Sequence, residues 1–144
     1  MSELITKFVV AGIIQDNDGR IFIQQRQSNV EYPNKWELPG GKVEAHENIL
    51  SALSRKLEEE GIGYVKQHGP IIAAIEKTSI KKYQYILLFM KVKIHNTDLI
   101  YKEKLTAAQD FTWISRQSLI TPAIDFTHED LKVFLTIPDV WRPF

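Results

Sequence analysis

The sequence predicts an α/β fold, a sandwich of helices around a mixed sheet, formed as one domain over residues 1–144. Three observations favour this class. Apolar, β-like segments lie on both sides of one clear helix pattern, a second helix pattern comes near the C-terminus, and no repeat or linker divides the chain. A length of 144 residues suits one ordinary domain, and 44% hydrophobic with 25% charged residues is typical of globular proteins.

Two strands are predicted before the first helix. The first is rich in Val, Ile and Phe, and the second alternates, with Ile21 and Ile23 on one face and Phe22 on the other. An Asn-Asp-Gly turn at residues 17–19 joins them as a hairpin. The predicted segments before the helix are strands over residues 4–14 and 20–26, a polar loop over 28–35 and a short extended piece over 36–41.

Residues 48–60 give the clearest helix, because apolar residues recur there at helical spacing and Gly61 ends the pattern. The apolar positions on its predicted buried face are Ile49, Leu50, Leu53 and Leu57. The predicted later elements are strands over 70–77, 83–94 and 111–114, a helical turn over 115–120, and a helix over 125–136 with Phe126, Leu131, Phe134 and Leu135 inward.

Composition excludes several classes of function. Lys plus Arg and Asp plus Glu both number 18, so the net charge of zero argues against a protein that binds a nucleic-acid polymer or a membrane through bulk charge. The absence of cysteine excludes a disulfide scaffold, a thiol nucleophile and a cysteine zinc site. No apolar run is long enough to span a bilayer. These features together predict a cytoplasmic protein.

The candidate chemistry lies where the double glycine Gly40-Gly41 precedes the helix. A helical wheel places Glu59 and Glu60 at the edge of the buried face, with Lys56 between them. Paired carboxylates beside a glycine turn suit a site for Mg²⁺ or Mn²⁺, whose preferred ligands are oxygens. The alternative is a glutamate run on the surface near a helix end.

Residues 41–62 resemble the Nudix box of the Nudix (MutT-like) hydrolases, G-x5-E-x7-R-E-U-x-E-E-x-G-U, where U is a bulky aliphatic residue. The positions that match in register are Gly41, Glu47, Arg55, Leu57, Glu59 and Glu60. The resemblance is good over about residues 4–62 and weaker over 111–131. It implies an α/β/α sandwich around a mixed sheet, and hydrolysis of a nucleoside diphosphate linked to another group, with Mg²⁺ or Mn²⁺ as cofactor.

By this resemblance, Glu59, Glu60, Glu47 and Arg55 form the catalytic set. Glu59 and Glu60 are implied metal ligands, with the backbone carbonyl of Gly40 or Gly41 as another. Glu47 and Arg55 are implied to form the pair that locks the loop onto the helix.

The sequence departs from the family pattern in three places. Lys56 stands where the box has the glutamate after its arginine, which changes the local charge by two units. Gly61 follows Glu60 directly, one residue early. Many members also offer a glutamate about six residues before a tryptophan; counted from Trp113, that position is Ala107 here. Glu103 or Asp110 replaces it only if the loop bends differently.

The function that follows is a metal-dependent, MutT-like pyrophosphohydrolase that acts on nucleoside di- or triphosphate derivatives and releases a nucleoside monophosphate. One alternative is a catalytically weak or inactive domain that binds a nucleotide or regulates another process, and another is a nucleotide-sugar or dinucleotide pyrophosphatase. Lys56 also permits a third idea, in which it contacts a phosphate oxygen and replaces one metal ion.

Four residues are candidates for substrate binding. Arg26, Lys42 and Lys56 are candidates for the phosphates. Asp125 follows a Thr-Pro-Ala-Ile stretch similar to the one near which MutT-like enzymes read the base edge, although it also suits the N-cap of the last helix. The expected partner is a small nucleotide, and a homodimer is left open.

Overall fold

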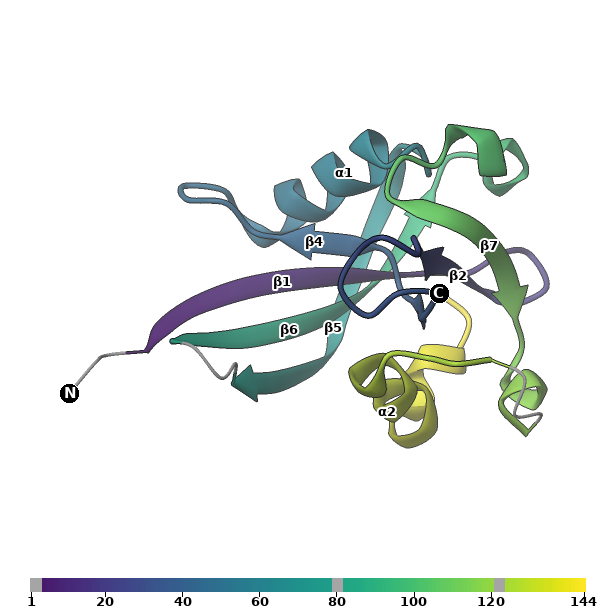
Figure 1. Ribbon diagram of the computed structural model, residues 1–144. Helices are drawn as coiled ribbons and strands as arrows, with labels where there is room; N and C mark the ends of the chain where they lie inside the picture. The colour runs from purple at the N-terminus through teal and green to yellow at the C-terminus, as the bar shows by residue number, and fades with distance from the viewer. Residues whose placement is uncertain (1–3, 79–81, 121–123) are drawn as a thin grey trace.

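The structure is a computed structural model that describes residues 4–78, 82–120 and 124–144. The strands of the described residues form two sheets, with helix α1 on one side and helix α2 on the other (Figure 1). The strands are β1 (Ile5–Ile14), β2 (Ile21–Arg26), β3 (Trp36–Glu37), β4 (Gly40–Lys42), β5 (Val65–Thr78), β6 (Tyr83–Ile94) and β7 (Ala108–Ile114). The helices are α1 (Ile49–Glu59) and α2 (His128–Thr136), with short 3₁₀ turns η1 (Thr97–Leu99), η2 (Lys102–Lys104), η3 (Arg116–Ile120) and η4 (Pro138–Trp141).

The larger sheet has the strand order β4-β1-β6-β5, and the smaller one has the order β3-β2-β7. Strands β1 and β6 run parallel in a register that begins at Ile5 opposite Tyr83 and ends at Ile14 opposite Val92. The other pairs are antiparallel, so the sheet is mixed, as the sequence predicted.

Two apolar cores lie on opposite faces of these strands, because successive side chains of a strand point to opposite sides. In β2, Phe22 packs into the core under α1, and Ile21 and Ile23 pack into the core over α2. In β6, Met90 and Phe89 divide in the same way. This arrangement confirms the α/β/α sandwich and the predicted faces of the second strand.

Helix α1 begins where the side chain of Asn48 accepts a hydrogen bond from the Ser51 N–H, 2.8 Å away, and Leu53 and Leu57 are fully buried beneath it. The prediction for Leu50 is wrong. It is 45% exposed, since it lies in the first turn and belongs to neither core.

Helix α2 starts three residues later than predicted, and Thr127 precedes it as N-cap. Phe126 and Phe134 are buried as expected, but Leu135 is 61% exposed, so its predicted burial is wrong. Leu135 lies about 100° around the helix from Phe134, beyond the buried stripe. Neither helix in the described parts of the chain is both long and apolar enough to cross a membrane.

Candidate active site

A cavity of about 1400 Å³ opens between the face of β1 and β6, the loop after β2 and helix α2. Its wall contains the double glycine of β4 and the last residue of the helix pattern, Glu60, together with Arg26 and Glu37. A volume of this size exceeds the few hundred Å³ that bind small ligands, so a nucleotide fits with room for water. Of the predicted box, Gly41 and Glu60 therefore border the cavity, whereas Glu47, Arg55 and Glu59 are not residues of its wall.

Close packing requires a glycine at position 40, and at position 41 it leaves space that the side chain of Lys56 uses. A side chain at Gly40, which has φ 152°, would place its Cβ 1.9 Å from the Val10 carbonyl oxygen. A Cβ at Gly41 would lie 2.4 Å from Cε of Lys56. The missing side chains thus allow β4 to pair with β1 and leave room for the stem of Lys56.

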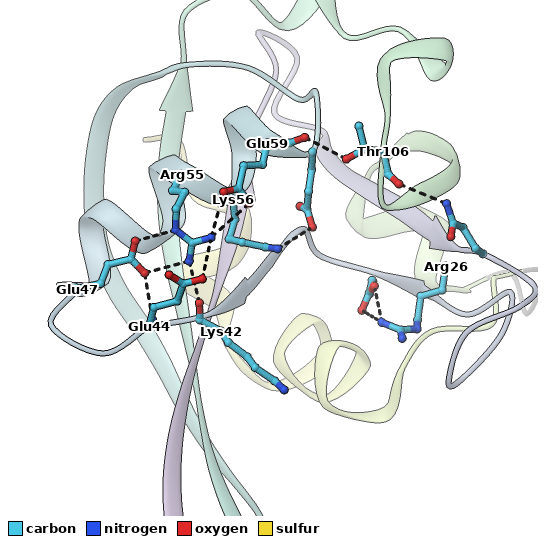
Figure 2. A network of polar contacts seen from close by, with 11 residues as sticks. Arg26, Lys42, Glu44, Glu47, Arg55, Lys56, Glu59 and Thr106 are labelled. Carbon is cyan, nitrogen blue, oxygen red and sulfur yellow. Dashed lines mark hydrogen bonds and ion pairs between the residues drawn. The ribbon is translucent and has the colours of Figure 1, made fainter.

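Arg55 fastens the loop after β4 to helix α1. Its Nε and Nη2 donate to the two carboxylate oxygens of Glu47 at 2.7 and 3.0 Å, and Nη2 also donates to the Lys42 carbonyl at 3.2 Å (Figure 2). These bonds, with the Glu44 N–H, lower the pKa of Glu47 to about 2. The structure thus brings together the pair that the family resemblance implied.

The two paired glutamates have different surroundings. Glu59 is half-exposed, and both of its carboxylate oxygens lie 3.3 Å from Nη1 of Arg55. Glu60 is 6% exposed, which is more buried than the helical wheel predicted, because the chain leaves the helix there and Gly61 packs against the Lys104 carbonyl.

Glu60 keeps one unsatisfied oxygen. Its Oε1 lies 3.8 Å from Nζ of Lys56, and Oε2 has no hydrogen-bond partner within the described ranges. Burial raises the pKa of Glu60 to about 7, against the opposing effect of Lys56. A buried, unpaired carboxylate oxygen in a cavity wall is expensive, so its position points to a ligand that supplies a positive charge or a proton.

The sequence did not indicate a second carboxylate in the cavity wall, the partly buried Glu37. Arg26 donates to it through Nη1 at 3.0 Å and to the Glu31 carbonyl through Nε at 2.7 Å. Burial raises the pKa of Glu37, and its charge in turn raises that of Glu60. The available signal was the pairing of β3 with β2, which places Glu37 opposite the buried Gln24.

A sequence model described as the NUDIX domain matches residues 6–135 of the chain. The chain belongs to this family. The match covers every strand and both helices, apart from the first residue of β1 and the last residue of α2. The membership agrees with the box that the sequence analysis identified around the cavity.

Relatives with NUDIX-type activities are similar to parts of the chain. The 8-oxo-dGTP diphosphatase of Escherichia coli (strain K12) is 37% identical over 68 residues, 47% of this chain and 52% of that protein. The nucleoside triphosphatase NudI of Enterobacter sp. (strain 638) is 28% identical over 123 residues, 78% of this chain and 84% of that protein. The chain spans about half the length of the curated relatives that it matches first.

A solved structure supports the same fold. The solution structure of the Escherichia coli ORF135 protein superposes with a TM-score of 0.71 at 26% identity, covering 92% of this chain and 88% of that one.

Two of the candidate residues for phosphate line the NUDIX cavity, and the third, Lys56, lies behind its wall. Arg26 and Lys42 are part of its wall, and the side chain of Lys42 extends away from the network of Arg55 (Figure 2). Lys56 contacts Gly41 and Glu60, which are both part of the wall.

The position of Asp125 contradicts one of the two interpretations of the sequence and leaves the reading of the base edge as a prediction. It is not the N-cap of α2, which is Thr127, so that interpretation is wrong. Its carboxylate is 73% exposed and accepts a hydrogen bond from Nζ of Lys35 at 2.7 Å; Lys35 is part of the cavity wall, and Asp125 itself is not. Helix α2 instead presents the buried Asp130 to the cavity. Thr121, Pro122 and Ala123 of the stretch before it lie outside the described residues.

Neither candidate for the later carboxylate reaches the cavity. Glu103 is exposed in η2, and Asp110 of β7 accepts a hydrogen bond from the N–H of its neighbour Phe111. Ala107, where the family spacing falls, does form part of the wall. The spacing therefore located the position, and this chain has no carboxylate there.

The donors around Glu60 fit a Mg²⁺ or Mn²⁺ ion held loosely. The described residues contain no cluster of three or more His, Cys, Asp or Glu side chains able to hold a metal by themselves. Mg²⁺ in proteins is commonly held by one or two carboxylates together with water and substrate phosphates. The unpaired oxygen of Glu60 suits that mode, whereas the carboxylate of Glu59 is paired with Arg55 and is not part of the cavity wall.

Proposed function

We propose that this NUDIX chain hydrolyses nucleoside triphosphates, adding water across a phosphoanhydride bond to release a nucleoside monophosphate and pyrophosphate. The observation that carries the proposal is the buried Glu60, whose unpaired oxygen belongs to the wall of a nucleotide-sized cavity beside the glycine turn. The names of the relatives, a diphosphatase of 8-oxo-dGTP and a nucleoside triphosphatase, support this substrate class.

In this proposal Glu59, Glu60 and the carbonyl of Gly41 hold a divalent ion, Mg²⁺ or Mn²⁺. When bound, such an ion supplies positive charge to phosphate oxygens and helps to orient the attacking water. Glu47 and Arg55 act through position, because their bonds keep the loop and the helix together.

Lys42 and Arg26 bind phosphate oxygens from the cavity wall, Lys42 with a side chain that extends away from the network of Arg55 and Arg26 from its pair with Glu37. Positively charged groups there favour the polyphosphate over uncharged parts of the substrate. A homodimer stays a prediction, which the molar mass in solution by light scattering would test.

Lys56 favours a second candidate, a domain that binds a nucleotide with little or no turnover. Its ammonium group lies 3.8 Å from the buried carboxylate that should hold the metal ion. A cation in this position competes with a second cation for the same carboxylate.

A release assay separates the two candidates. We would measure pyrophosphate and phosphate release from nucleoside triphosphates, 8-oxo-dGTP, dinucleotides and nucleotide sugars with Mg²⁺ and Mn²⁺, for the wild type, Glu59→Gln and Lys56→Glu. The matched control is Glu58→Gln, since Glu58 is exposed on the same helix turn.

Turnover by the wild type that falls at least ~100-fold in Glu59→Gln and persists in Glu58→Gln supports the hydrolase. An inert wild type with an active Lys56→Glu variant supports the binding domain. Equal turnover in Glu59→Gln and the wild type would show that the ligand assignment is wrong.

A further inference from the structure

Each of the two predicted ligands is already paired with a cation of its own helix, four residues earlier. Arg55 lies 3.3 Å from Glu59, and Lys56 lies 3.8 Å from Glu60. Pairs at this spacing face each other on a helix, so both are part of the fold of α1. The positive charge beside the buried carboxylate of Glu60 therefore comes from the protein's own residue Lys56.

The position of Lys56 is fixed by its stem. Its side chain is 25% exposed, and its Cε, Cδ and Cγ lie 2.4, 3.0 and 3.3 Å from where a Cβ on Gly41 would be. The stem thus fills the space that the glycine leaves against the turn. An aliphatic stem packed along backbone restricts where the ammonium can lie, and here it lies beside Glu60.

Glu60 has a buried carboxylate oxygen that is open to a ligand. More than nine-tenths of it is buried, it belongs to the cavity wall, and its Oε2 finds no partner among residues 4–78, 82–120 and 124–144. The ammonium group of Lys56 forms an ion pair with Oε1 at 3.8 Å, which is longer than a hydrogen bond. The carboxylate therefore has one face that an internal cation occupies and one face open to a ligand.

We propose that Lys56 is a built-in cation that leaves the free protein without a tight site for a divalent ion, so that the ion is bound only together with the phosphates of the nucleotide. The role in turnover rests on the proposed function, whereas the effect on metal binding does not. A divalent ion at Glu60 must share the carboxylate with the ammonium, while substrate phosphates add the negative charge that makes room for both.

The test is a Mn²⁺ titration of the free protein, followed by the electron paramagnetic resonance signal of unbound Mn²⁺ and by calorimetry, without any nucleotide. The variants are Lys56→Glu, which reverses the charge, and Lys56→Met, which keeps the stem and removes the charge. Lys42→Met is the matched control, because it removes the same charge from the cavity wall at a residue that forms no ion pair with Glu60 in the described parts of the chain. Circular dichroism melting verifies that each variant folds.

We expect weak binding in the wild type and in Lys42→Met, binding roughly tenfold tighter in Lys56→Met, and at least ~30-fold tighter in Lys56→Glu. A wild type that binds Mn²⁺ as tightly as Lys56→Glu would overturn the inference. An equal gain in Lys42→Met would also overturn it, because the effect would then be general electrostatics. Loss of hydrolysis with this binding pattern intact would count against the proposed function alone.

Discussion

Asp130 offers a sharp test of the electrostatics around the cavity. Its carboxylate is buried under α2 and accepts a hydrogen bond from the Leu38 N–H at 2.9 Å, just before the glycine turn. The perturbation is Asp130→Asn, which keeps an oxygen acceptor for Leu38 and removes the titrating group. The companion Asp130→Ala removes the acceptor as well.

The size of the effect on the free energy of unfolding follows from the difference between the pKa of Asp130 in the folded and in the unfolded chain. Burial raises the pKa of Asp130 from its ordinary 3.8 to about 7. The folded protein then holds a proton that the unfolded chain releases, so stability is highest at low pH and falls as pH rises through about 7. Between about pH 5 and pH 8 this one group accounts for a loss of about 2–3 kcal/mol in the free energy of unfolding. For a chain of this size, that is a fall of roughly 6–10 °C in Tm.

The assay is urea unfolding, with thermal melts beside it, at a series of pH values from about 5 to 8. Glu60 has a pKa raised to about 7 as well, so Asp130→Asn should reduce the pH dependence by about half rather than abolish it. Asp130→Ala should also lose about 1–3 kcal/mol at every pH, since it leaves the buried Leu38 N–H unpaired. A slope in Asp130→Asn as steep as in the wild type would refute the reasoning.

Two further substitutions test the turn and the loop. Gly40→Ala should lower the free energy of unfolding in urea by at least about 2 kcal/mol, because its Cβ would meet the Val10 carbonyl oxygen at 1.9 Å. Gly19→Ala, with φ 79° and open space around it, is the matched control, and an equal loss there would leave only backbone strain as the cause. Glu47→Gln should destabilise the protein near neutral pH, and its deficit should shrink as pH falls from about 4 towards 2. The reason is that the lowered pKa of Glu47 contributes stability above its ordinary value and loses it on protonation; a deficit that stays constant down to pH 2 would contradict this.

The sequence predicted the elements of the fold well because their periodicity reflects burial on both sides of the sheet. The predicted strand over 83–94 has the bounds of β6, and the divided faces of β2 correspond to the two cores. Periodicity does not give the width of a buried face or the place where packing ends. Leu50 and Leu135 fit the apolar pattern, yet the first turn of α1 and the far side of α2 have nothing packed over them.

The sequence predicted the contacts of the site that depend on the spacing of residues within one segment. The contact between Glu47 and Arg55 follows from a loop that leads directly into a helix, so a local motif is enough to locate it. Glu37 and Asp130 reach the cavity from other elements, through the pairing of β3 and the docking of α2. One sequence does not reveal these contacts, because they depend on how distant elements pack.

The parallel pairing of β1 with β6 has a consequence for how the protein is made. Thr6 and Gln84 lie side by side although 78 residues separate them along the chain. Pairing these two strands closes a long loop. The chain loses the entropy of that closure before most contacts of the sheet have formed to compensate for it. Strand β6 provides part of the cavity wall, so the cavity takes shape only after β6 has been synthesised. Folding should therefore be slow for a chain of this size, and a nascent chain that ends at α1 should expose the apolar face of that helix to chaperones.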